Sequence, residues 1–304
     1  MNGMNGMMSA ISANCALKHA SRKIAALSAV FALVVAMPAA ADDEGAQAAS
    51  EAKLLRICAA ADEAPYSARD KSGFENKIAE IVAEAMGRKA YFFWSNKPAI
   101  YAIRDQLEMK VCDVVMGVDT GDARVATTKS YYVAPYVFVQ RKDSPLKITD
   151  WKSPDLAKAK NIGFVEGTPA DVMLNQLDLW TSHITYSRSL SNFQSKRNKY
   201  TRVPPQRMIG EVADGTADLA VGFAPEIARF VKANDKLRMT VIPEGNRRVD
   251  GEPVPHHFEQ SIAVRKGDTE LFAEIDKALD IARPKIEAVL KEEGIPLVPA
   301  PPRT

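Results

Sequence analysis

The residue types that perform nucleophilic or metal chemistry are present in this sequence, but not at the spacings that such chemistry requires. Serine, histidine and aspartate all occur, yet no serine lies in the context of a nucleophile elbow. Cys58 and Cys112 have no recognisable base partner. His256 and His257 are adjacent, so on a strand they would point to opposite faces rather than share a metal ion. The sequence therefore predicts a binding protein rather than an enzyme, with no metal and no cofactor.

Phosphate chemistry is equally poorly supported. The segment from Gly163 to Gly167 lacks the lysine and the spacing of a P-loop, and it has too few glycines for a dinucleotide fingerprint. Trp94, Trp151 and Trp180 are more typical of core or surface anchors than of stacking platforms. One catalytic alternative stays open, in which a cleft carboxylate such as Glu166 acts as the base of a hydrolase or dehydratase.

The N-terminal segment predicts export. Three basic residues precede an apolar run from Ile24 to Met37, which is shorter than the roughly 20 residues of a membrane-spanning helix. Small residues follow, so we expect a signal peptide over residues 1–41, cleaved near Ala41. The mature chain would then be free in the periplasm, without membrane insertion. An uncleaved anchor is the alternative.

The charge of the mature chain argues against nucleic acid as a partner. The leader holds three basic and no acidic residues, so its removal lowers the formal net charge from +2 to −1. About 260 residues remain, which suffices for one large domain or for two lobes.

Export would also remove Cys15 and leave an even number of cysteines, as expected where thiols can be oxidised. Both remaining cysteines, Cys58 and Cys112, lie on expected strands. A disulfide requires Cα atoms within roughly 7 Å, and a parallel register could separate them further. We favour a disulfide between them, and two buried unpaired thiols are the alternative.

Strands and helices alternate along the chain, which predicts parallel βαβ units, and the pattern starts again after Ser144-Pro145. Extended segments over 136–141 and 260–265 flank the middle part, and a helix over 269–290 follows. The other expected elements are strands over 54–59, 90–94, 111–117, 161–165 and 218–223, and helices over 74–86, 98–109 and from Thr168, as N-cap, onward.

This pattern predicts an α/β fold of two lobes, each a mostly parallel sheet flanked by helices. We expect residues 53–140 and 258–304 in one lobe and 143–245 in the other. The hinge segments would lie near 139–143 and 246–260, where the chain crosses between the lobes and returns.

Seven short motifs occur in order along the mature chain. They are Leu55-Arg56-Ile57, Ala64-Pro65-Tyr66, Gly73-Phe74-Glu75, Cys112-Asp113-Val114-Val115, Tyr131-Tyr132, Gly163 to Thr168 and Gly215 to Val221. In this order they resemble the type II periplasmic solute-binding proteins. The resemblance implies two lobes joined by paired hinge strands, a ligand cleft at the carboxyl ends of the strands, and closure like a clam shell.

Longer uninterrupted strings carry a more specific resemblance. They are Asp62 to Ser67, Gly73 to Ala79, Trp94 to Tyr101, Cys112 to Gly121 and Lys291 to Gly294 with Pro296. These strings resemble the MoxJ family, also called MxaJ, and its relative XoxJ. That resemblance implies an accessory protein of a pyrroloquinoline-quinone (PQQ) methanol dehydrogenase in methylotrophic bacteria, which assists maturation or activation of the enzyme.

The resemblance also implies cleft residues. In the amino-acid-binding relatives an arginine after the third strand pairs with the ligand carboxylate, and Arg124 lies in that region. A solvated charge beside Asp119 and Asp122 is the alternative. The turn at Gly167-Thr168 matches a second-lobe anion site, with a plain helix cap as the alternative. The implied ligand or partner cleft is Asp62, Tyr66, Trp94, Asp119, Thr120, Arg124, Gly167, Thr168 and Phe223.

Departures from the amino-acid receptors predict a more apolar cleft. Where those relatives place a second-lobe carboxylate for the ligand's amino group, this chain has Phe223-Ala224-Pro225. Where they place first-lobe hydroxyls, it has Gly117 and Val118, and an aromatic that stacks on the ligand is replaced near Pro98. We therefore expect no micromolar affinity for free amino acids.

Three functions follow, in order of preference. The first is a periplasmic accessory factor that binds a quinoprotein methanol dehydrogenase. The second is a solute receptor of an ABC transporter for a small anionic or apolar ligand. The third is the enzyme that uses Glu166. Fold alone cannot choose among them.

Overall fold

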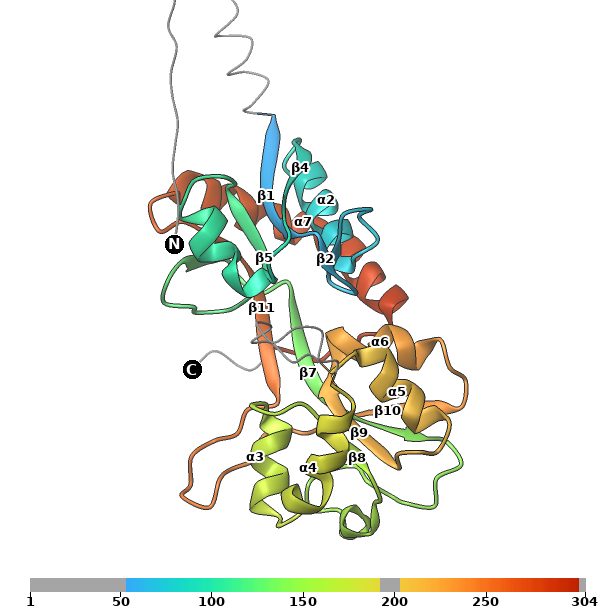
Figure 1. Cartoon of the computed structure of the whole chain (residues 1–304). Helices are drawn as coiled ribbons and strands as arrows, with labels where there is room; N and C mark the ends of the chain where they lie inside the picture. The colour runs from blue at the N-terminus through green and yellow to red at the C-terminus, as the bar shows by residue number, and fades with distance from the viewer. Residues whose placement is uncertain (1–52, 192–202, 301–304) are drawn as a thin grey trace, which may run out of the picture. The chain divides into compact units, whose positions relative to one another are not determined.

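The computed structural model describes residues 53–191 and 203–300 (Figure 1). The expected signal peptide lies outside the described residues. Within those two ranges, none of the helices combines the length and the apolar character needed to cross a bilayer.

The first half of the fold is a sheet centred on β1 (Leu54–Ala60). This strand pairs in parallel with β4 (Lys89–Ser95) on one side and with β5 (Val114–Asp119) on the other. Strand β11 (His257–Val264) then pairs antiparallel with β5. The helices α2 (Phe74–Ala85) and α7 (Thr269–Glu293) pack against one another beside this sheet (Figure 1). The short elements are β2 (Asp62–Glu63), β3 (Ser67–Ala68), β6 (Ala126–Thr127), η1 (Ala99–Tyr101) and η2 (Ile103–Leu107).

The second half is organised around β7 (Tyr132–Arg141). Its later residues pair antiparallel with β9 (Leu219–Phe223) and β10 (Leu237–Val241), and β8 (Ile162–Gly163) pairs in parallel with β9. The helical segments of this half are η3 (Pro154–Lys158), α3 (Pro169–Gln176), α4 (Trp180–Ser189), α5 (Pro205–Ala213) and α6 (Ala224–Lys232).

Strand β7 links the two halves. Tyr132 to Pro135 pair with β11, whereas Tyr136 to Val139 pair with β9. The chain therefore leaves the first half along β7 and returns along β11, whose Ser261 lies opposite Val118 of β5. We propose the lobe limits expected above, 53–140 with 258–304 and 143–245. The return crossing falls between 245 and 258, whereas the outward crossing lies within β7, between Pro135 and Tyr136.

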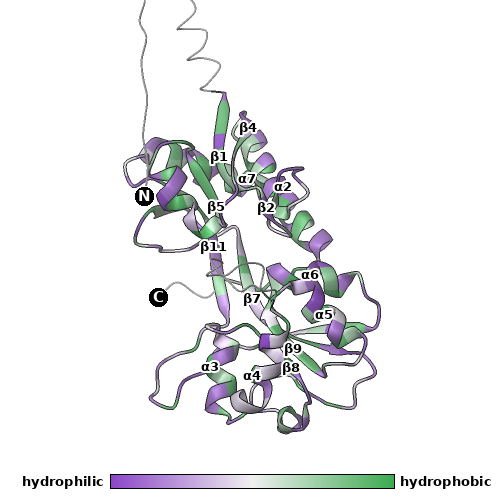
Figure 2. Cartoon of the chain, in the orientation of Figure 1, coloured by the Kyte–Doolittle hydropathy of each residue, from purple (hydrophilic) through white to green (hydrophobic). Residues whose placement is uncertain are grey.

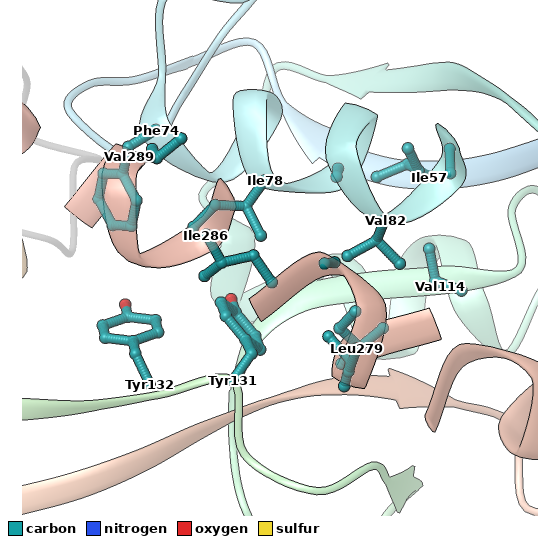
Figure 3. Packing of buried hydrophobic residues seen from close by; sticks show 14 of the residues in the cluster. Ile57, Phe74, Ile78, Val82, Val114, Tyr131, Tyr132, Leu279, Ile286 and Val289 are labelled. Atoms are coloured by element: carbon teal, nitrogen blue, oxygen red, sulfur yellow. The ribbon is translucent and has the colours of Figure 1, made fainter. Parts of the chain in front are cut away.

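Separate cores support each half. In the first, Phe74, Ile78 and Val82 of α2 face Ile286 and Leu279 of α7 (Figure 3). Each of these side chains is at most 1% exposed. In the second half, apolar side chains of β7 point alternately to two clusters, with Phe138 in one and Val137 and Val139 in the other. Figure 2 shows green apolar strands in both halves beneath helices with purple outer faces.

Three expected elements differ from the structure. The segment 98–109 is helical, but it forms a 3₁₀ turn and a π-helix instead of an α-helix. Strand β5 begins at Val114 instead of 111, because Arg265 binds the carbonyl of Cys112 at 2.6 Å and the carboxylate of Asp113 at 3.0 Å. Strand β8 ends at Gly163, because the Ser187 hydroxyl occupies both backbone groups of Phe164.

Cys58 and Cys112 form the favoured disulfide, with Cα atoms 5.4 Å apart. Cys58 lies on β1 and Cys112 is buried just before β5, so the bond ties two adjacent strands across 54 residues of chain.

A Cys58→Ala, Cys112→Ala variant should lose about 2–4 kcal/mol of unfolding free energy, since the unfolded chain gains loop freedom. Urea denaturation checks this, and an unchanged midpoint would contradict it.

Candidate functional site

A cavity of about 300 Å³ opens at the carboxyl ends of β1 and β5, the position at which open α/β sheets commonly bind ligands. Its wall also includes the loop from β2 to β3, the start of α2, and the junction of β9 and α6. The cavity therefore draws on both halves of the fold. The lining residues are Ile57, Cys58, Ala59, Ala60, Glu63, Tyr66, Ser67, Glu75, Asn76, Phe92, Ala99, Ala102, Val115, Met116, Gly117, Asp119, Phe223, Glu226 and Gln260.

Glu75 is a buried carboxylate in this wall, 5% exposed. The hydroxyl of Tyr131 donates to it at 2.5 Å and that of Tyr132 at 3.3 Å, while the Gly117 N–H donates to the Tyr131 oxygen at 2.9 Å. Burial raises the pKa of Glu75 to about 7, and the two tyrosine hydrogen bonds oppose that rise because they stabilise the charged form.

Two further polar groups have fixed partners in the cavity. Gln260 donates its amide to Asp119 at 2.6 Å. The Asn76 amide donates to the Ser67 hydroxyl at 3.0 Å, and that hydroxyl donates to the Ala60 carbonyl at 2.7 Å. These bonds hold the loop that carries Tyr66 against the end of β1.

The formal charges in the cavity wall have one sign. Glu63, Glu75, Asp119 and Glu226 line it, and the described lining residues include no lysine, arginine or histidine. Burial also raises the pKa of Tyr66 well above its ordinary value, and the neighbouring Glu226 adds to the shift. The cavity can therefore hold apolar or positively charged groups more readily than anions.

Comparison with known proteins places this architecture in a family. Residues 55–288 match the model of the bacterial extracellular solute-binding proteins, family 3. Protein MoxJ of Methylorubrum extorquens AM1 is 48% identical over 278 residues, which cover 91% of this chain and 92% of that relative. This chain belongs to family 3, within its MoxJ group.

Solved structures agree with that assignment. MxaJ from Methlophaga aminisulfidivorans MPT superposes with a TM-score of 0.76 at 47% identity, over 80% of this chain and all of that one. The periplasmic binding protein XoxJ from Methylobacterium extorquens AM1 has a TM-score of 0.59 at 25% identity, over 81% of this chain and all of that one. The chain therefore has the expected two-lobe, type II solute-binding fold.

The fold of this MoxJ-group protein brings together three of the expected cleft residues. Tyr66, Asp119 and Phe223 all line the cavity. Asp62 is exposed on β2, and Trp94 stacks on Phe92 with ring centroids 5.2 Å apart. Neither of these two lines the cavity, so their role in a cleft stays a prediction.

Four other expected residues also lie outside the cavity wall. Thr120 bonds to Ser261, with 2.6 Å between the two hydroxyl oxygens. Arg124 is exposed and pairs with Asp122 at 2.6 Å, which is the alternative left open for it. At the start of α3, the Gly167 N–H donates to Asp171 at 2.9 Å and the Thr168 hydroxyl donates to the Val165 carbonyl at 2.6 Å. Thr168 occupies the N-cap position without a side-chain cap bond.

The catalytic and metal alternatives gain no support from the geometry. Glu166 is ion-paired with Arg188 at 2.7 Å, and this partner lowers the pKa of Glu166, which is unfavourable for a base. His256 is fully buried and its Nε2 accepts from the Trp151 indole at 2.8 Å, so both residues brace the core. Among the described residues no cluster of three metal-ligating side chains exists.

The reason given above for weak amino-acid binding needs correction. Phe223-Ala224-Pro225 offers no carboxylate, but Glu226 in the first turn of α6 lines the cavity and supplies one. Among the described lining residues there is instead no cation for a ligand carboxylate. We still expect calorimetry to show no micromolar binding of common amino acids, because an unpaired carboxylate costs a few kcal/mol. Micromolar binding of any of them would contradict this.

The sequence contains an indication that Glu75 is a site residue, namely its position on the apolar face of a helix. Glu75 stands three, four and seven residues before Ile78, Ala79 and Val82, on the apolar face of α2. A carboxylate on a buried helix face is unusual enough to mark a site. Glu226 had no comparable signal, because only the tertiary fold brings it to the cavity.

Position 117, beside Glu75, favours glycine because of its backbone conformation and the little space around it. It has a positive φ of 65°, and a Cβ at this position would lie 3.1 Å from the Glu75 Oε1. Gly117→Ala should therefore lose more stability than Gly121→Ala, a control with φ of 87° and no atom within 4 Å of its Cβ position. We expect about 1 kcal/mol for the control and about 2 kcal/mol for Gly117→Ala in urea denaturation. Equal losses would show that Glu75 does not constrain this position.

Proposed function

We propose that this protein is a periplasmic accessory factor that binds a PQQ-dependent methanol dehydrogenase and supports its maturation or activation. The observation that carries the proposal is the 48% identity to MoxJ over 91% of the chain. The MxaJ structure adds a similar fold at 47% identity. The resemblance in the strings around Trp94 to Tyr101 and Cys112 to Gly121 implies the same role.

A periplasmic location agrees with the extracellular character of the matched family and with the Cys58–Cys112 disulfide, which persists in oxidising compartments. The proposed export signal over residues 1–41 would deliver the chain there. A cleaved N-terminus at Asp42 in protein isolated from the periplasm would support this part of the proposal.

Binding fits the site better than transport of a small anion or catalysis. The cavity wall carries four carboxylates and no described cationic side chain, which disfavours an anionic solute. Glu166, the candidate base, is held in an ion pair. An accessory factor needs neither an anion site nor a catalytic base.

A chromosomal deletion tests the function. We expect periplasmic methanol dehydrogenase activity to fall several-fold in the deletion strain, with normal uptake of solutes, and a plasmid copy of the gene should restore it. Measuring the amount of dehydrogenase protein in the same extracts separates lost activation from lost synthesis. Normal activity in the deletion strain, or a specific defect in solute uptake, would overturn the proposal.

A further inference from the structure

The cavity at the ends of β1 and β5 has a composition that the proposed function does not explain. A flat partner-binding surface needs no cavity, yet this one has a volume of about 300 Å³, at the lower end of the range of small-molecule sites. Its wall is largely apolar, with the aromatic side chains Tyr66, Phe92 and Phe223. Such walls exclude water and strengthen the effect of any charge inside.

The formally charged side chains of the cavity wall are carboxylates. For two of them, Glu75 and Asp119, the described residues supply no neutralising cation. The partners of Glu75 are tyrosine hydroxyls, and the partner of Asp119 is the Gln260 amide. In the described part of the chain neither carboxylate takes part in an ion pair, and Glu75 is buried whereas Asp119 is exposed. A buried carboxylate without a cation favours a ligand that supplies one.

Aromatic side chains from both halves of the fold line the same cavity as Glu75. Tyr66 packs on Phe74 with centroids 5.3 Å apart, beside Glu75, and Phe223 belongs to a second group with Tyr136 at 5.2 Å. Ring faces attract cations, and they do so best for alkylated ammonium groups, which are weakly hydrated. A carboxylate and aromatic side chains that line one apolar space have the composition of an ammonium site.

We propose that this cavity binds a small organic monocation of the alkylated ammonium class that carries no carboxylate, with Glu75 as its counter-ion. The lack of a described lining cation rejects amino acids and other zwitterions. The apolar wall rejects a hydrated divalent metal ion, and no cluster of metal-ligating side chains exists among the described residues. This proposal does not rest on the methanol dehydrogenase function, and either can fail without the other.

Binding should be coupled to proton release. The titratable groups that face Glu75 are Tyr131, just before β7, Tyr132 at the start of β7, and Tyr66 of the loop after β2, and none of these carries a positive charge. A bound cation would lower the pKa of Glu75 from about 7, so its proton leaves to solvent when the cation enters. As the pH is raised toward 7, the affinity should therefore increase about tenfold per pH unit, and above pH 7 it should level off.

Calorimetry of the mature protein with three probes tests the site. Choline carries the trimethylammonium group, 3,3-dimethylbutan-1-ol is its neutral isostere, and glycine betaine adds a carboxylate. At pH 8 we expect choline to bind at least tenfold more tightly than either of the others. At pH 6.5, titrations in buffers of different ionisation enthalpy should show release of a fraction of a proton for each choline bound.

Two variants test whether Glu75 is the counter-ion of the bound cation. Glu75→Gln should weaken choline binding at least tenfold and leave the weak binding of the neutral isostere unchanged. Glu84→Gln, an exposed position of the same helix, should bind as the wild type does. Equal affinity for choline and its isostere, undetectable binding of both choline and tetramethylammonium at 10 mM, or full choline affinity in folded Glu75→Gln protein would each overturn the proposal.

Discussion

Glu75→Gln is expected to make the protein more stable than the wild type at pH 8, by up to about 3 kcal/mol. In the folded protein the pKa of Glu75 is raised to about 7 from its ordinary value of 4.5, chiefly by burial. The folded state therefore keeps a proton that the unfolded chain releases between about pH 4.5 and pH 7. The stability of the wild type should fall as the pH rises through this window and then level off. The glutamine carries no charge and removes this dependence.

The measurement is urea denaturation of both proteins at pH 5, 6, 7 and 8. Glu84→Gln is the control, because that carboxylate lies on the same helix but is exposed. The control should keep the slope of the wild type, while Glu75→Gln should show a smaller fall between pH 5 and pH 8. A Glu75→Gln protein whose stability follows the wild-type curve would show that the carboxyl ionises in the folded state as it does in water.

Arg229→Ala should cost about 2–4 kcal/mol of unfolding free energy, because it leaves a buried carboxylate without its main partner. Arg229 of α6 donates to both oxygens of Glu293 in α7, at 2.7 and 2.9 Å, and Glu293 is 6% exposed. The guanidinium also donates to the Ser72 carbonyl at 3.2 Å. Arg229 is one third exposed, so the effect should be smaller than for a fully buried pair. Thermal denaturation at pH 7 measures it.

Two variants separate the charge from the packing. Arg124→Ala removes a similar two-donor pair with Asp122 at an exposed position, and it should change stability by less than about 0.5 kcal/mol. In Arg229→Met, Glu293→Met, apolar side chains replace both charges, so much of the loss should be recovered. If Arg229→Ala is no more destabilising than Arg124→Ala, the contact between α6 and α7 does not stabilise the fold.

The helices and strands could be predicted from the sequence where neighbouring residues determine them. Strand β1 is an apolar run, and α2 repeats apolar residues at Ile78 and Val82 before the positive-φ Gly87 ends it. The limits of β5 and β8 could not be predicted, because Arg265 and Ser187 bind backbone groups beside these strands from distant positions in the sequence. Sequence periodicity contains no record of such contacts.

The residues of the candidate site were harder to predict from the sequence than the fold. Tyr66, Asp119 and Phe223 were expected in the cleft and line the cavity, but through a resemblance and not through a pattern of spacing. For Arg124 the structure shows the local alternative, because its backbone N–H and its guanidinium both bind Asp122, two residues away, and a role in ligand binding stays a prediction. Glu226 reaches the cavity only because α6 begins directly after β9.

Capture of the dehydrogenase from the periplasm tests the proposed function most directly. The mature protein, tagged at its C-terminus and expressed from its own promoter, should co-purify a quinoprotein methanol dehydrogenase at micromolar concentrations. The recovered complex should re-form from the separated proteins in sedimentation velocity. An untagged strain and a tagged, unrelated periplasmic protein are the controls. Absence of the dehydrogenase from the capture, together with independent sedimentation of the two purified proteins, would contradict the function proposed here.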